Sequence, residues 1–408
     1  MSKNIKITFL MFAVVALLVF SNSQEVLFRV SSLKDKIKES VSSIFFIHSV
    51  TSEKLQEKYG DSKRTNNKVR ILVVPGHDEG TVGTRFADAK ETDLNAVVAE
   101  EIFELLTQDG NFDPILLRNT FGYNTSFIEY LHSHREEINT FITDKKVEMT
   151  NLILEGLVDP HKGVMHNKAP GEVAFMLYGI NKWANDLNVD IVIHIHFNDY
   201  PKKKSDSVGK YSGFAIYVPE EQYSNAKASR AIGEKVLSSI SRFYPTSNLP
   251  AESGGLVPEQ WLIAIGASNT LDAASLFLEL GYIYESILHP ASIREKTLNH
   301  LAWLTYDGLL DFFEGESDGR RTFEPYLRHE FSRDIGLDAK KDTDVWHLQT
   351  FLAYEGHYPP KGKTSRNCPL NGYFGPCTEM AVKTFQEINN IPATGFVGSA
   401  TRSALNNN

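Results

Sequence analysis

Residues 69–77 read Val-Arg-Ile-Leu-Val-Val-Pro-Gly-His. The run is short, mostly apolar and rich in β-branched residues, and a Pro-Gly pair ends it, which is the pattern of a strand buried on both faces. Apolar residues then recur at helical spacing from Asp93 to Gln108, and Gly110 ends that helix. A second apolar run at residues 114–118 completes a β-α-β unit. The sequence therefore predicts an α/β fold with a mostly parallel sheet flanked by helices.

The chain continues in this pattern for most of its length. We expect further strands at residues 189–197, 213–218 and 274–280, and helices at residues 224–241 and 293–313. Residues 119–188 form a long, mainly helical stretch that exceeds a simple crossover connection. We interpret it as a helical insertion that packs over one end of the sheet and gates a cleft there.

Composition limits the classes of partner. The chain has 408 residues, of which 42% are hydrophobic and 23% charged, which is ordinary for a soluble protein of two domains. The formal net charge of -9 argues against a nucleic-acid partner, because phosphate binding needs a clustered excess of Lys and Arg.

The N-terminus indicates export. Lys3 and Lys6 precede a stretch from Ile7 to Phe20 that is apolar apart from Thr8, and small polar residues follow. The stretch is shorter than the roughly 20 apolar residues of a typical membrane span. It fits a cleaved signal peptide or a short N-terminal membrane anchor at residues 1–23. We therefore expect a protein that is periplasmic, cell-wall-associated or extracellular, either free or tethered to the membrane.

Changes of composition mark the domain boundaries. Residues 24–68 are polar and helix-leaning, as expected for a helical stalk or extension. A catalytic domain is expected at residues 69–316, with the helical insertion at about 119–188. The stretch 317–342 begins with polar, glycine-containing sequence that is typical of a linker. A small second domain of helical pattern follows at residues 343–408.

Metal-binding residue types fall at strand ends in the catalytic domain. His77 directly follows the first strand, and Glu91 lies where the first helix begins. His194 and His196 lie two apart on one strand and therefore share a face. Glu279 lies in the last apolar run. The carboxyl ends of strands in an open α/β sheet are where ligands bind, so these side chains are expected to converge.

Taken singly, each of these residues has a simple structural explanation, such as an edge histidine or a glutamate that favours a helix N-terminus. Together they fit one chemistry. Two histidines and one glutamate form a catalytic zinc set with an open position for water. A separate glutamate then acts as the general base.

In these motifs the chain resembles the zinc-dependent N-acetylmuramoyl-L-alanine amidases, which are cell-wall hydrolases. The family pattern is a strand followed by Pro-Gly-His, then Lys-Glu at the first helix, then Ile-His-x-Asn, then Glu-x-Gly-Phe/Tyr. The same pieces stand here in the same order, as Pro75-Gly76-His77, Lys90-Glu91, Ile195-His196-Phe197-Asn198 and Glu279-Leu280-Gly281-Tyr282. Arg118 resembles the arginine that ends the second strand of the family.

The resemblance implies a fold of the phosphorylase/hydrolase-like type and a role for each matching residue. His77, Glu91 and His196 would bind Zn²⁺, and Glu279 would be the catalytic carboxylate. Arg118 and Asn198 would contact substrate or support the ligands, and His194 would be a buried residue or part of a second layer. The expected reaction is hydrolysis of the amide between the muramoyl lactyl group and L-alanine of the peptidoglycan stem peptide.

The second domain resembles the small three-helix peptidoglycan-binding domain. The residues that carry the resemblance include Trp346, Phe385-Gln386 and the turn at residues 394–398. An insertion between Tyr358 and Asn371 departs from the pattern. The two cysteines, Cys368 and Cys377, favour a disulfide that pins this insertion, because without a nearby histidine pair they make a poor zinc site.

Two other functions remain open at this stage. One is a different zinc hydrolase on the same ligands, such as a peptidase of the stem peptide. The other is a wall-binding protein with a degenerate hydrolase domain, although the presence of all the chemical residues argues against it. The helical insertion is the expected target of a regulatory partner.

Overall fold

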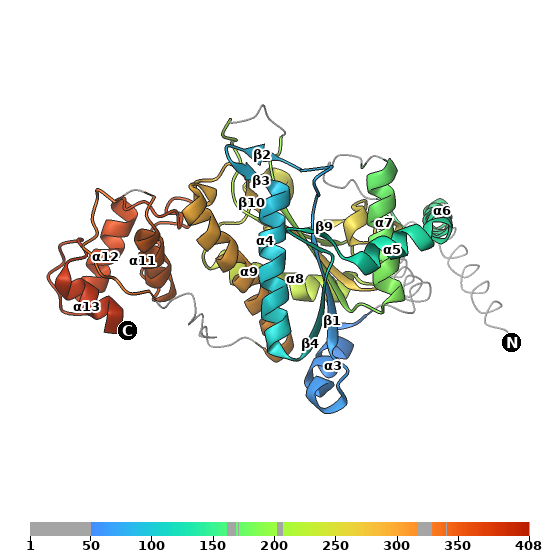
Figure 1. Cartoon of the computed structure of the whole chain (residues 1–408), viewed down its shortest axis with the longest axis horizontal. Helices are drawn as coiled ribbons and strands as arrows, with labels where there is room; N and C mark the ends of the chain where they lie inside the picture. The colour runs from blue at the N-terminus through green and yellow to red at the C-terminus, as the bar shows by residue number, and fades with distance from the viewer. Residues whose placement is uncertain are drawn as a thin grey trace, which may run out of the picture.

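The computed structural model describes residues 50–160, 169, 171–201, 207–315, 329–339 and 341–407 (Figure 1). The signal peptide or anchor predicted at residues 1–23, the first part of the predicted extension and half of the predicted linker lie outside these ranges. Within the described ranges, no helix has the length and apolar character needed to span a bilayer.

A six-stranded sheet forms the centre of the catalytic domain, in the order β4-β1-β7-β10-β8-β9. The first four strands in this order run parallel: β4 (Phe112–Leu116), β1 (Val69–Pro75), β7 (Ile191–Asn198) and β10 (Ala274–Tyr282). β8 (Ala215–Pro219) is antiparallel to β10, and β9 (Leu256–Glu259) is parallel to β8. The prediction of an α/β fold with a mostly parallel sheet is confirmed.

One face of the sheet is covered by α4 (Glu91–Asp109), α8 (Ala226–Ser241) and α9 (Ala291–Glu314) (Figure 1). Alternate strand residues such as Ile71 and Val73 point into this main core, while Leu72 and Val74 point to the opposite face. All four are buried, which explains why β1 is apolar throughout instead of alternating.

The helical insertion forms much of the layer on the second face. α5 (Thr125–Ser133) and α7 (Gly171–Asp186) bury Phe127, Ile180 and Trp183 against the sheet residue Val192. α6 (Arg135–Leu154) packs on α7. The sheet therefore has helices on both faces, and α5 and α7 are parts of the hydrophobic core.

The end of the predicted stalk or extension is part of the catalytic domain. α3 (Ser52–Thr65) buries Leu55 and Tyr59 in the main core, and the Tyr59 ring stacks on Phe313 with 4.6 Å between centroids. Lys58 Nζ lies 2.5 Å from Asp190 Oδ2. These contacts hold α3 against the ends of α9 and β7, so this helix is an addition to the domain and does not stand apart from it.

The second predicted strand differs at its boundaries. β4 begins at Phe112 and ends at Leu116, while Arg118 opens a separate hairpin of β5 (Arg118–Asn119) and β6 (Gly122–Tyr123). The Asn119 side chain accepts hydrogen bonds from the backbone N–H groups of Phe121 and Gly122, at 2.9 and 3.1 Å. An Asn that closes a local turn in this way stops the strand from continuing through it.

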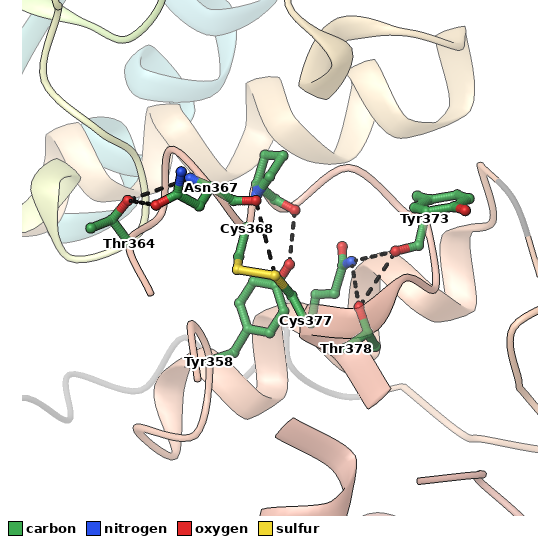
Figure 2. Close-up of a disulfide and its surroundings, with 9 residues drawn as sticks. Tyr358, Thr364, Asn367, Cys368, Tyr373, Cys377 and Thr378 are labelled. Atoms are coloured by element: carbon green, nitrogen blue, oxygen red, sulfur yellow. Dashed lines mark hydrogen bonds between the residues drawn. A yellow bond between two sulfur atoms is a disulfide. The ribbon is translucent and has the colours of Figure 1, made fainter. Parts of the chain in front are cut away.

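The C-terminal region contains α11 (Thr343–Tyr354), α12 (Pro376–Ile388) and α13 (Ser399–Asn407), as expected for a three-helix domain. The Asp342 side chain caps α11 by accepting the N–H of Asp344. Cys368 and Cys377 are joined by a disulfide (Figure 2). In Figure 1 these helices lie together beside α9.

We expect Leu55→Ala to destabilise the catalytic domain, because Leu55 is only 1% exposed and lies in the main core. The loss should be about 2–5 kcal/mol, the usual cost of removing a buried leucine side chain. Chemical denaturation followed by circular dichroism measures it. Glu57→Ala, on the exposed side of α3, is the control and should change stability by less than about 0.5 kcal/mol. Equal stability of the two variants would contradict the packing of α3.

Candidate metal centre

His77, Glu91 and His196 come together at the carboxyl end of the parallel strands. His77 follows β1, Glu91 is the first residue of α4, and His196 lies near the end of β7. One ligand atom from each lies within 4.8 Å of the others, the arrangement needed to hold one metal ion. The side chains of His77, Glu91 and His196 are 31%, 5% and 15% exposed, so the cluster is sheltered but reachable from one side.

The Glu91 carboxylate lies between the two imidazoles. Its Oε1 is 3.2 Å from His77 Nε2 and 3.0 Å from His196 Nδ1. Backbone N–H groups of Thr84 and Phe197 also donate to it, at 2.9 and 3.3 Å. Burial acts to raise the pKa of the Glu91 carboxyl, but hydrogen bonds from the two histidines and their charges outweigh it and lower the pKa. Glu91 is therefore held as a carboxylate.

Arg118 holds the loop that carries His77. Its Nε donates to the carbonyl of His77 at 2.7 Å, and one Nη donates to the carbonyls of Gly76 and Thr92 at 2.8 and 2.9 Å. The side chain is buried and binds backbone around the cluster, so its geometry is that of a support for the ligands. His77 has a left-handed φ of 61°, an unfavourable conformation that such contacts stabilise.

Asp78 completes this support. Its Oδ1 accepts hydrogen bonds from the N–H and hydroxyl of Thr81, at 2.7 and 2.8 Å, and closes a turn. Its Oδ2 accepts the Tyr123 hydroxyl at 3.0 Å, which links the His77 loop to the β5–β6 hairpin. Asp78 therefore serves as a turn residue beside the cluster.

Two glycines leave room for the ligands. A Cβ on Gly76 would lie 2.0 Å from His196 Cε1, and a Cβ on Gly83 would lie 2.3 Å from Glu91 Oε2. Gly83 also has a φ of +70°, which disfavours other residues. The Pro-Gly-His sequence thus needs its glycine because an imidazole occupies the space of a side chain.

His194 lies apart from the cluster. It is 1% exposed, its ring stacks near Phe277, and it makes a hydrogen bond to the backbone of Ala264 in the 3₁₀ helix η2 (Ile263–Ile265). Burial lowers the pKa of His194 to about 3, so the ring is neutral. It shares a face of β7 with His196, as the spacing predicts, but is covered by protein.

Glu279 lies beside the cluster on the neighbouring strand. It is directly opposite His196 in the register of β10 and β7. Its Oε2 is buried and has no hydrogen-bond partner among the described residues. Burial raises the pKa of Glu279 well above its ordinary value, and the charges of Glu91 and Glu252 add to the effect. A carboxyl group in this state is suited to accept and return a proton.

Glu252 is a part of this region that the sequence analysis missed. It ends the 3₁₀ helix η1 (Pro250–Glu252) and is 1% exposed. Its Oε1 accepts the Tyr217 hydroxyl at 2.7 Å and the Asn198 side-chain amide at 3.2 Å, and its Oε2 accepts the Tyr282 hydroxyl at 3.4 Å. Glu252 thereby links side chains of β7, β8 and β10, and it holds the side-chain amide of Asn198 in place. No sequence pattern around it signals this role.

Comparison with known families agrees with this geometry. Residues 71–309 match the N-acetylmuramoyl-L-alanine amidase family, and residues 341–405 match a putative peptidoglycan-binding domain. The chain belongs to the N-acetylmuramoyl-L-alanine amidase family. The resemblance inferred from four short motifs is therefore confirmed. The cluster of His77, Glu91 and His196 lies inside the matched region.

Individual relatives in the family match parts of the chain. The N-acetylmuramoyl-L-alanine amidase CwlL of Bacillus licheniformis is 42% identical over 89 residues, which are 22% of this chain and 24% of that protein. This chain therefore matches about a quarter of that relative. The solved CwlD amidase of Clostridioides difficile, in complex with the GerS lipoprotein, is 13% identical, with 61% of this chain and 100% of that chain covered and a TM-score of 0.40. The Ami1 amidase of Mycobacterium smegmatis is also 13% identical, with 61% and 98% covered and a TM-score of 0.40.

We expect Gly83→Ala to weaken metal binding, because the added methyl group meets the Glu91 carboxylate and the backbone φ becomes strained. The loss of affinity should be on the order of 10–100-fold, as for other changes that displace a ligand from its support. Isothermal titration with zinc measures it.

Gly80→Ala is the matched control. It lies in the same loop, and its added Cβ meets only Asp78 Oδ1 at 3.4 Å, which is ordinary contact. This variant should bind zinc as the unaltered chain does. Equal zinc affinity of the Gly83 and Gly80 variants would show that the space around Glu91 does not control the site.

Proposed function

We propose that the chain is a zinc-dependent N-acetylmuramoyl-L-alanine amidase that cleaves the amide between the muramoyl lactyl group and L-alanine of peptidoglycan. The observation that carries the proposal is the His77–Glu91–His196 cluster with the unpartnered carboxyl oxygen of Glu279 beside it, within the region that matches the amidase family.

The donor set fits zinc. Two imidazole nitrogens and one carboxylate oxygen are a known catalytic zinc set, with zinc–ligand distances of about 2.0–2.2 Å. The spacings of 3.0 and 3.2 Å between Glu91 and the two histidines suit ligand atoms that share one such ion. Bound there, zinc supplies a Lewis acid that activates water at neutral pH and polarises the scissile carbonyl.

Glu279 provides the proton transfer in this mechanism. It accepts the proton of the attacking water and then delivers it to the amine of L-alanine as the amide bond breaks. Its buried oxygen has no competing partner among the described residues, so the transfer meets no rival hydrogen bond. Asn198, fixed by Glu252, lies two residues beyond His196 and is placed to orient substrate or this part of β7.

Peptidoglycan is both substrate and binding partner in this proposal. The C-terminal domain at residues 343–408, which follows a linker at residues 317–342, would hold the polymer while the catalytic domain cuts it. Such a protein works outside the cytoplasm, bound to the cell wall. The apolar N-terminal segment would export the chain and either be removed or tether it to the membrane.

We restrict the proposed gate from the whole helical insertion to one of its helices. α5 and α7 bury Phe127 and Trp183 in the core, so neither helix is free to open as a gate. We propose that α6 forms the gate and is the site where a regulatory partner binds. Its buried residues are Ile138, Met149 and Leu152.

The identity of the new amine terminus tests the reaction. We expect purified peptidoglycan treated with the zinc-loaded protein to release stem peptides that begin with a free L-alanine, detected by mass spectrometry. A different new terminus would indicate a peptidase on the same ligands. No released peptide would indicate a wall-binding protein.

Glu279→Gln tests the division of roles. The variant should keep its zinc, because Glu279 is outside the ligand cluster, but lose activity by roughly 10²–10⁴-fold, the usual contribution of a general base. Zinc content and peptide release are measured on the same sample. Glu101→Gln, on α4 away from the cluster, is the control and should keep both. Loss of zinc from Glu279→Gln would overturn the proposed roles.

A further inference from the structure

The C-terminal domain shares a core with the catalytic domain. The Trp346 ring of α11 meets the buried His300 ring of α9 edge to face, at 5.8 Å between centroids. Tyr354, the last residue of α11, packs on Phe243 at 4.6 Å. Contact of this kind between buried aromatic rings is typical of the interior of one domain, and a flexible linker would not produce it.

A second, polar contact comes from Arg366, in the insertion at residues 359–370. Its Nη1 donates to the carbonyl and hydroxyl oxygens of Ser212, the first at 3.1 Å, and its Nη2 donates to the carbonyl of Thr246. Hydrogen bonds from a charged donor are stronger than those between neutral groups. One guanidinium therefore ties two separate loops of the catalytic domain to the C-terminal domain.

These two loops are connected through hydrogen bonds to residues that contact Glu252. Ser212 exchanges hydrogen bonds with Asn248, donating at 2.8 Å and accepting at 3.1 Å. The next residue, Gly213, donates to Glu285 Oε1 at 2.9 Å, and the same oxygen accepts the N–H of Tyr282 at 2.8 Å. Tyr282 is one of the residues whose hydroxyl holds Glu252. The Arg366 contact is thus connected to the metal site through a short series of hydrogen bonds.

Arg366 also supplies positive charge where the catalytic domain buries a carboxyl group. Burial raises the pKa of Glu285, and the charge of Arg366 acts in the opposite direction. Arg366 and Glu285 are therefore opposite charges that face each other across this contact.

The insertion is held in place by a disulfide and by a hydrogen bond from Tyr358. It contains no helix or strand, and the disulfide between Cys368 and Cys377 joins it to the first turn of α12 (Figure 2). The Tyr358 hydroxyl donates to the carbonyl of Pro369 at 3.1 Å. Arg366 is two residues from the disulfide, so the bond restricts where its side chain is presented.

We propose that residues 359–370 are a docking element that fixes the peptidoglycan-binding domain on the catalytic domain, with Arg366 as the latch and the disulfide as its support. The surface formed by Ser212 and Thr246 has the C-terminal domain of the same chain as its partner. A polymer held by that domain then reaches the metal site in a set orientation. This use on peptidoglycan rests on the proposed function, while the docking rests on geometry alone.

Hydrogen exchange of the full chain, followed by mass spectrometry, tests the docking. We expect Arg366→Ala to accelerate exchange of the amides of residues 212–214 and 247–248 by roughly tenfold, because the loops lose a charged hydrogen-bond donor. Lys363→Ala removes an exposed charge from the same insertion and should leave exchange unchanged. Unchanged exchange in Arg366→Ala would overturn the latch.

The role of the disulfide is tested by replacing both Cys368 and Cys377 with Ser. This double variant should show the same faster exchange in the two loops while the amides of α11 and α12 keep their protection. Wild-type exchange in the loops would overturn the supporting role of the disulfide. If the double variant does not fold, the same loop measurement on the wild type after reduction with a dithiol decides the point.

The effect of docking on polymer cleavage is measured by comparing the activity on insoluble peptidoglycan with the activity on a soluble muropeptide. Arg366→Ala should lose activity on insoluble peptidoglycan severalfold more than on a soluble muropeptide. Equal losses of activity on the two substrates would overturn the proposal that docking orients the polymer. The docking itself would still be decided by the hydrogen-exchange measurement. A wild-type chain that cuts neither substrate would refute the proposed function, and the exchange result would still stand.

Discussion

The hydrogen bonds that hold the Glu91 carboxylate between His77 and His196 are the interaction on which this site depends. A carboxylate that is 5% exposed is stable only with close partners, and here it has two imidazoles and two backbone N–H groups. It also opens α4, where the helix dipole favours negative charge. β1, β7 and α4 must therefore pack correctly before the three side chains meet.

The sequence predicted the parts of this arrangement that are local. β1 is a continuous apolar run that His77 follows, and β7 is a mainly apolar run that contains His196. Pattern and motif order therefore predicted the residues that meet in the cluster. Glu252 was out of reach because its role comes from a loop that meets the hydroxyls of Tyr217 on β8 and Tyr282 on β10, both far from it in the sequence. Hydrophobic periodicity shows no such contact.

The helical insertion shows a related limit. Its apolar periodicity indicated helices, but periodicity tells only which face of a helix is apolar and not what covers it. In the structure α5 and α7 place that face on the sheet, where Phe127 and Trp183 lie 5.1 Å apart. The β5–β6 hairpin escaped prediction for a different reason, since the turn between its strands is closed by the Asn119 side chain and leaves no mark in the apolar pattern.

X-ray absorption spectroscopy of the zinc-loaded full chain tests the metal centre most directly. With one zinc bound per chain, we predict two imidazole ligands and nitrogen or oxygen donors at about 2.0–2.2 Å, with one imidazole lost in a His196→Ala variant. A spectrum with sulfur ligands, or one that is unchanged by loss of His196, would contradict the assignment of His77, Glu91 and His196 as the zinc site.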